Sequence, residues 1–215
     1  MKISLDSPFF EKGDRVGELF FAGFLWLIFS TPIVTVGAAS SALYYTTVKV
    51  VRRKRDTVWR SFWGAFKSSF KQGTAVTLLY LLFAALLVFC VLTGKNMQVG
   101  AELSMFAGAG FVISIPFVVI LPWIFAVISR FSAGLQQQLW YAVHMAIGHL
   151  PTTLALLGML LLAVLLVYLF PFLLLVVPGG YAWLSSLLIE RVMKSYMKKE
   201  LEKYADSEDV PWYLE

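Results

Sequence analysis

The residues of this sequence that could carry chemistry are few and lie far apart. His144 and His149 have no carboxylate close to them in the sequence, so a histidine-based metal site would lack ligands. Cys90 is the single cysteine, which excludes an intrachain disulfide and any metal site built from several cysteines. We therefore expect no metal and no cofactor, and we interpret the two histidines as structural or interfacial residues.

Two acidic residues border long apolar segments and are the remaining candidates for chemistry. Glu18 is close to Arg15, and Glu190 is followed directly by Arg191. Each could form an ion pair with its neighbour or take part in a proton or ion pathway. Their position at segment edges favours ion pairing, because functional charges inside membranes usually lie deeper. No phosphate-binding loop, dinucleotide motif or nucleophile elbow accompanies them, so an enzyme is not predicted.

Composition identifies the structure that must position these residues. Of the 215 residues, 59% are hydrophobic and only 14% are charged, whereas soluble domains carry about 25% charged residues. Apolar runs at residues 78–92, 111–128 and 153–177 approach the roughly 20 residues that a helix needs to cross a bilayer. Because backbone groups in lipid must be hydrogen-bonded internally, we predict an all-α, polytopic transmembrane helical bundle. It would form one domain over residues 1–205, followed by a short acidic C-terminal tail at residues 206–215.

About six spans are expected from the lengths of the apolar regions. Residues 16–51 and 151–191 are each too long for one upright helix, and both contain residues that break helices. We predict a helical hairpin in each region, with two further spans at residues 74–93 and 103–128. The predicted helix breaks contain Pro32, Gly37, Pro178, Gly179 and Gly180. We interpret them as tight turns, and a hinge that shapes a substrate site is the alternative.

A cytoplasmic amphipathic helix is predicted at residues 57–71, where aromatic and basic residues recur on neighbouring helical faces. This pattern is typical of a helix lying in the membrane interface. Its aromatic residues are Trp59, Phe62, Trp63, Phe66 and Phe70. Residues 136–149 show a milder version of the same pattern.

The positive charges predict the orientation of the chain. With six spans and both termini on one side, all of the 18 Lys and Arg residues except Lys95 lie on that side, which the positive-inside rule makes cytoplasmic. The cluster expected to bind anionic lipid headgroups or to fix the topology comprises Arg52, Arg53, Lys54, Arg55, Arg60, Lys67 and Lys71. Because the basic run abuts a span, anionic lipid is a simpler partner than nucleic acid, which is not expected. An acidic protein partner is the alternative.

Several short motifs together resemble a known family. They are Leu25-Trp26, the run Pro-Ile-Val-Thr-Val-Gly at residues 32–37, Ala42-Leu43-Tyr44-Tyr45, Arg130-Phe131 and His149-Leu150-Pro151-Thr152-Thr153. The sequence resembles the YesL-like membrane proteins, a bacterial family of unknown function. The resemblance implies a small multi-pass protein of the bacterial cell membrane, often encoded beside carbohydrate ABC importers and two-component regulators. It implies no functional residue.

Two functions remain open at this stage. The first is an accessory or regulatory membrane protein linked to carbohydrate uptake, with a carbohydrate ABC importer or a sensor kinase as its partner. The second is a small transporter or exporter of a small solute, working as a homo-oligomer. The broken helices and a weak repeat, in which residues 62–65 and 74–79 resemble residues 139–142 and 152–157, favour the second. The expected lack of a buried charged pair for ion coupling counts against it.

Overall fold

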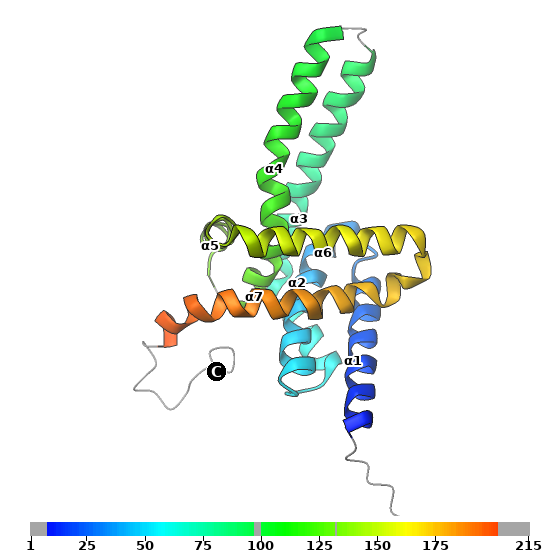
Figure 1. Cartoon of the computed structure of the whole chain (residues 1–215), viewed down its shortest axis with the longest axis vertical. Helices are drawn as coiled ribbons and strands as arrows, with labels where there is room; N and C mark the ends of the chain where they lie inside the picture. The colour runs from blue at the N-terminus through cyan, green and yellow to red at the C-terminus, as the bar shows by residue number, and fades with distance from the viewer. Residues whose placement is uncertain (1–7, 97–99, 132, 202–215) are drawn as a thin grey trace, which may run out of the picture.

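The computed structural model describes residues 8–96, 100–131 and 133–201, and all regular structure in these residues is helical (Figure 1). The prediction of an all-α fold is therefore confirmed, whereas the predicted acidic tail lies outside the described residues. The α-helices are α1 (Pro8–Phe29), α2 (Val36–Thr46), α3 (Val58–Asn96), α4 (Gly100–Arg130), α5 (Leu135–Gly148), α6 (Leu150–Leu169) and α7 (Val177–Leu201). Two short 3-10 helices, η1 (Ile33–Thr35) and η3 (Pro171–Leu175), and one π-helical segment, η2 (Thr47–Arg52), join them.

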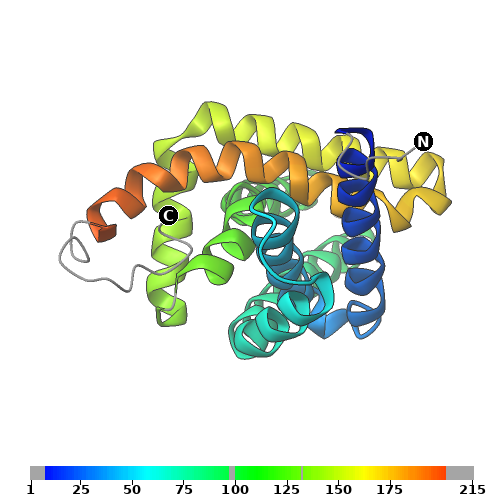
Figure 2. The ribbon, with the colours of Figure 1, turned by 90° about the horizontal axis from the view of Figure 1, so that it is seen from below.

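Two antiparallel helix pairs, whose axes run in different directions, dominate the shape. In Figure 1, α3 and α4 lie side by side and project away from the remaining helices, whereas α6 and α7 run across them. The short helix α2 lies in the middle and contacts α1, α3, α4 and α7 (Figure 2). Thus α2 is the element around which the other helices meet.

The core consists of two clusters of buried side chains that share α2. One joins α4, α5 and α7 and includes Trp123, Met145 and Met193. The other joins α1, α2 and the first turns of α3 and includes Leu25 and Phe62. Because α2 is rich in Gly, Ala and Ser, its backbone can approach several neighbouring helices closely.

Helix α2 approaches α3 closely at Gly37. A Cβ atom at this position would clash with the carbonyl oxygen of Gly73 on α3 and with Oγ1 of Thr77. The backbone N–H of Gly37 donates a hydrogen bond to the same Thr77 hydroxyl, at 2.9 Å. Gly37, predicted at a helix break, is therefore also a contact point between two helices.

The structure supports fewer membrane spans than the sequence analysis predicted. In the described part of the chain, three helical segments are long and apolar enough to cross a membrane, namely Val58–Phe89, Val112–Arg130 and Leu150–Leu169. Their length and composition fit a membrane protein, but six spans are not supported. The predicted hairpins do break, but of the four α-helices described in them only α6 is both long and apolar enough to cross a membrane. Helix α2 has 11 residues, about 17 Å of helix against a hydrocarbon core of about 30 Å. Charged residues also shorten the apolar parts of α1 and α7.

The amphipathic segment at residues 57–71 is not a separate helix, which corrects a second prediction. It forms the first turns of α3, which continues without interruption to Asn96 because no proline lies between the two parts. Its aromatic face is divided: Phe62 and Phe66 are buried against Phe29 of α1, while Trp59 and Phe70 are exposed. Protein therefore covers part of the surface that the sequence analysis assigned to lipid.

Candidate functional site

A central cavity of about 480 Å³ lies where the helices of both pairs meet α1 and α2. Binding sites for small molecules usually have volumes of about 300 to 1,000 Å³. Each of six helices contributes to the wall, for example through Trp26, Tyr44, Tyr80, Phe125, Val167 and Tyr181. Aliphatic and aromatic side chains form most of this wall, so the cavity is a candidate site for an apolar ligand.

Most polar groups that line the cavity already have partners within the protein. The indole N–H of Trp26 donates to Oγ of Ser40 at 3.0 Å, and the hydroxyl of Tyr80 donates to the carbonyl oxygen of Phe117 at 2.8 Å. These hydrogen bonds satisfy donors that would otherwise be buried without a partner. The wall therefore offers mainly hydrocarbon to a ligand.

A buried ion pair lies beside the cavity and joins α4 to α7. Nε of Arg130 donates to Oε1 of Glu190 at 3.1 Å, and Nη2 of Arg130 donates to the same oxygen. The arginine side chain is 0% exposed and the glutamate side chain is 5% exposed. Charges buried to this degree are stable in a protein only when they are paired and hydrogen-bonded.

Tyr44 connects this ion pair to the cavity. Its hydroxyl donates to Oε1 of Glu190 at 3.2 Å, and the same residue forms part of the cavity wall. Through Tyr44, α2 joins the two helices held by Arg130. A ligand that displaced the Tyr44 side chain would therefore disturb the hydrogen bonds of the ion pair.

The ion pair corrects two expectations. Glu190 pairs with Arg130 and not with Arg191, whose side chain is exposed because successive residues on a helix point in different directions. The chain also contains a buried charged pair, which the sequence analysis did not expect. The two residues are 60 positions apart, so no local pattern could have matched them. The pairing of Glu18 with Arg15 stays a prediction.

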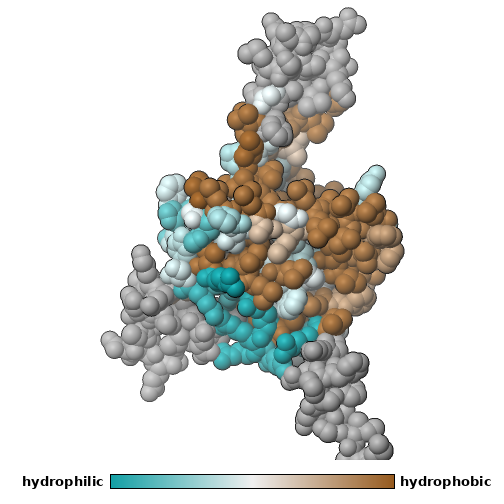
Figure 3. Space-filling model, viewed as in Figure 1, coloured by the Kyte–Doolittle hydropathy of each residue, from teal (hydrophilic) through white to brown (hydrophobic). Residues whose placement is uncertain are grey.

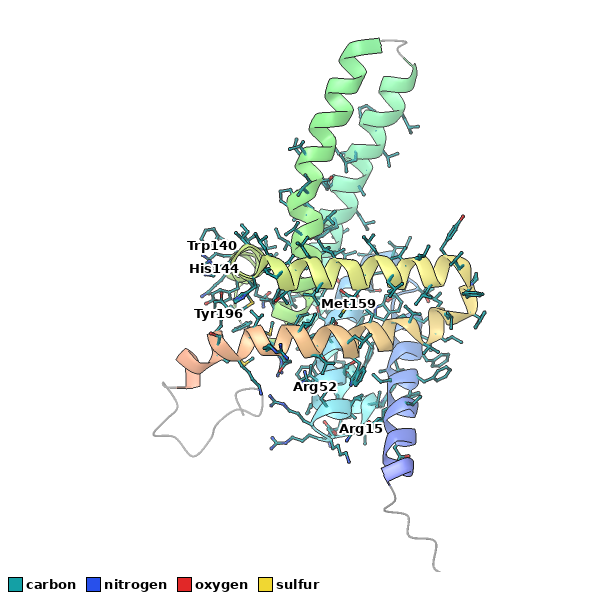
Figure 4. The ribbon with its side chains drawn as sticks, in the orientation of Figure 1. Arg15, Arg52, Trp140, His144, Met159 and Tyr196 are labelled. Atoms are coloured by element: carbon teal, nitrogen blue, oxygen red, sulfur yellow. The ribbon has the colours of Figure 1, made fainter. Side chains whose placement is uncertain are left out.

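The predicted basic cluster lies on one side of the molecule, and part of it contacts protein. Figure 3 shows a hydrophilic surface below the α6–α7 pair, and Figure 4 places Arg52 and Arg15 on this side. Nη1 of Arg52 donates to the carbonyl oxygen of Ser186 on α7 at 2.8 Å. Partial burial lowers the pKa of the Arg53 guanidinium, and the positive charge of Arg130 lowers it further.

The remaining cluster residues are accessible on the surface. Lys54, Arg55, Arg60 and Lys71 are exposed, and Nζ of Lys67 lies 5.0 Å from the ring centre of Trp63. This geometry allows a cation–π interaction between Lys67 and Trp63. Binding of lipid headgroups by the cluster stays a prediction.

The chain breaks beside the predicted positions and not at all of them, because Gly37 lies inside α2 and Pro178, Gly179 and Gly180 lie in the first turn of α7. Two of these glycines are packing positions. Pro32 precedes η1, and Pro178 opens α7 and lines the cavity. A Cβ at Gly179 would lie 2.5 Å from the carbonyl oxygen of Leu19 on α1, whereas a Cβ at Gly180 would meet nothing within 4 Å. Adjacent glycines therefore differ in their roles, since only the first allows α7 to approach α1.

The two histidines pack on one aromatic ring. Both His144 and His149 make edge-on contacts with Tyr196 of α7, with ring centres 6.1 Å apart in each case. Figure 4 shows His144 and Tyr196 close together beside Trp140. Among the residues that the structure describes, no group of three or more His, Cys, Asp or Glu residues could hold a metal ion.

Comparison with known proteins gives a family without an assigned activity. The family model described as "Protein of unknown function, DUF624" matches residues 19–90. No curated protein and no solved structure matches the chain. The matched segment is similar to a domain of unknown function and contains Gly37 and Tyr44, whereas Arg130 and Glu190 lie outside it. The wider resemblance to YesL-like proteins stays a prediction.

Proposed function

We propose that this protein is a noncatalytic accessory or regulatory component of the bacterial cell membrane that binds a partner protein within the bilayer. The apolar surface of α6 supports the proposal most directly. Apart from Thr153 and Leu156, the side chains of this fully described helix are exposed or only partly buried. Its exposed large side chains include Leu154, Leu161, Leu162, Val164, Leu165 and Leu169. An apolar surface of this extent is typical of sites that contact membrane or protein.

The proposed partner is a carbohydrate ABC importer or a sensor kinase. This choice rests on the resemblance to YesL-like proteins, whose genes often lie beside those of such systems. The basic surface around Arg52 would face the cytoplasm together with both termini, where it would contact anionic lipid or an acidic partner. The apolar surface of α6 would form the contact inside the membrane.

Site-specific photocrosslinking tests this proposal. A photoreactive amino acid replaces Leu161 on α6 or, as a matched control, the exposed Leu82 on α3. After irradiation of native membranes, tagged protein is purified and its adducts are identified by mass spectrometry. We expect a defined membrane protein to be captured from position 161 but not from position 82. Capture of the same background from both positions would contradict the proposal.

A transporter is the second candidate function, and the cavity favours it. The cavity lies between six helices, and one of its lining residues is Pro178, at the break before α7. The Arg130–Glu190 pair also supplies a charged pair buried inside the protein, although Arg130 stands at the end of its apolar segment and transporters usually place such charges deeper in the membrane. Flux of a panel of small solutes into vesicles carrying the purified protein, compared with empty vesicles, tests this function. Equal rates would weaken it, and self-crosslinking through Leu161 would favour the homo-oligomer that it requires.

A further inference from the structure

We propose that the central cavity binds one hydrocarbon chain of a membrane lipid, which enters from the side of α6. This inference goes beyond the accessory role and does not depend on it. The cavity volume of about 480 Å³ lies within the usual range for a binding site. All three apolar segments that are long enough to cross a membrane contribute residues to its wall, among them Tyr80, Phe125 and Val167.

The side entrance follows from two lining residues that also lie on the surface. Val164 of α6 and Leu174 of η3 both line the cavity, yet they are 60% and 37% exposed. The surface around them is strongly hydrophobic, as Figure 3 shows for the end of the α6–α7 pair. A lipid chain beside this surface would reach the cavity without crossing a polar region.

The chemistry of the wall selects a hydrocarbon chain over a sugar or an ion. The indole of Trp26 and the hydroxyls of Tyr80 and Tyr44 already donate to acceptors within the protein. A sugar buried here would lose its hydrogen bonds to water without gaining enough partners in return. A hydrocarbon chain loses no such bonds and fills the space with favourable packing contacts.

Tyr44 gives the occupied cavity a structural consequence. A chain that fills the cavity packs against the Tyr44 side chain, whose hydroxyl contacts Glu190. Occupancy would therefore hold Tyr44 in the position from which it donates to the buried ion pair. In this way the lipid supports the junction of α2, α4 and α7.

Photolabelling of the full-length protein in lipid nanodiscs tests the site. The probe is phosphatidylglycerol with a diazirine in one acyl chain, and a parallel sample contains diazirine-labelled palmitic acid to separate a phospholipid chain from a free fatty acid. Labelled positions are mapped by mass spectrometry. Ala163→Phe fills the cavity from α6, whereas Leu161→Phe adds a similar ring to the outer face of the same helix.

We expect labelling of cavity-lining residues to fall at least fivefold in Ala163→Phe and to be unchanged in Leu161→Phe. Labelling restricted to outward-facing residues, or equal in both variants, would overturn the proposal.

If Ala163→Phe does not fold, a fluorescence measurement on Trp26 takes the place of this variant. The Trp26 signal is the fluorescence of the wild type minus that of Trp26→Phe. Lipids with brominated acyl chains should quench this fluorescence. The quenching should persist after the protein is transferred to detergent that contains no brominated lipid, because the chain in the cavity stays bound. Full recovery on transfer would overturn the proposal.

Discussion

Helices α2 and α6 differ in a way that reverses the usual relation between hydrophobicity and burial. Of the 11 residues of α2, eight are buried, and most of these are Gly, Ala, Ser or Thr. By contrast, α6 has 20 residues and a long apolar run, yet only Thr153 and Leu156 of this fully described helix are buried. The less apolar helix lies at the centre of the protein, and the more apolar one lies at its edge.

The reason for this difference is the solvent. In lipid, apolar side chains gain little by leaving the surface, so close backbone packing and polar contacts hold helices together. The small residues of α2 allow such packing, and its Tyr44 reaches the Arg130–Glu190 pair. If this explanation is right, substitutions at the centre should be costly even when they are small. Substitutions on the outer face of α6 should cost little even when they are large.

The largest loss of unfolding free energy is expected when the buried Arg130–Glu190 ion pair is broken. Arg130→Met leaves the Glu190 carboxylate buried without its charged partner, which should cost about 3 to 5 kcal/mol of unfolding free energy. The double variant Arg130→Met/Glu190→Met should recover most of this loss, because no charge then remains buried. Chemical unfolding in mild detergent measures all three proteins. The exposed Arg191→Met is the control and should unfold like the wild type.

A double variant as unstable as the single one would change the interpretation. It would mean that the hydrogen bonds of the ion pair hold the helices together more strongly than an apolar contact could. The central polar network would then contribute directly to stability instead of being tolerated there.

Two leucines of α6 test whether burial or hydrophobicity decides the cost of a substitution. Leu156 is fully buried and Leu161 is 71% exposed, although both belong to the same helix. Leu156→Ala should cost about 2 to 5 kcal/mol because it leaves a cavity in the core. Leu161→Ala should change the unfolding free energy by less than about 0.5 kcal/mol. Unfolding measured in the same detergent compares them, and equal losses would show that the outer face of α6 packs on protein in the purified state.

Two glycines test the role of close backbone packing. Gly37→Ala would place a Cβ against the backbone of Gly73, and should cost about 1 to 3 kcal/mol because the helices must separate. Gly158→Ala on α6 meets nothing within 4 Å and should be neutral or slightly stabilising, since alanine favours helices. Thermal unfolding of both variants is the measurement. A neutral Gly37→Ala would contradict the central position of α2.

The sequence predicted those features that depend on local pattern. The all-helical fold, the helix breaks at Pro32 and before α7, and the start of α6 at residues 150–151 followed from proline placement and apolar run length. The same run lengths led to six predicted spans, because a broken apolar run looks the same whether its pieces cross a membrane or pack within the protein. Local pattern alone therefore predicted more spans than the described helices support.

The site itself could not be predicted from local pattern. The cavity depends on how α6 and α7 cross the other helices, and the ion pair joins residues 60 positions apart. Glu190 was noticed as a charge beside an apolar run and Arg130 as part of a family motif, but nothing in their spacing matched them to each other. A buried charge needs a partner because an unpaired one is costly, but the sequence does not say which residue that partner is.

The smallest effect on stability is expected from Asp56, which lies in the loop before α3 and belongs to neither α2 nor α6. The carboxylate of Asp56 accepts hydrogen bonds from Nζ of Lys49 at 2.9 Å and from the backbone N–H of Thr57 at 2.9 Å. These contacts lower the pKa of Asp56 from 3.8 to about 2, with the Lys49 hydrogen bond as the largest cause. The ionised form is thus favoured by folding, so its stabilising contribution is complete above about pH 4 and is lost as the pH falls towards 2.

Asp56→Asn isolates this contribution, because asparagine tolerates the positive φ of 74° found at this position. We expect the variant to unfold at a slightly lower temperature than the wild type at pH 7, with a difference that shrinks at pH 3. Asp14→Asn on α1 is the exposed control. A difference that stayed constant with pH would assign the effect to side-chain shape and not to charge. Since the loop carries the positive residues that the sequence analysis placed in the cytoplasm, the result also shows how firmly Asp56 fixes them relative to α3.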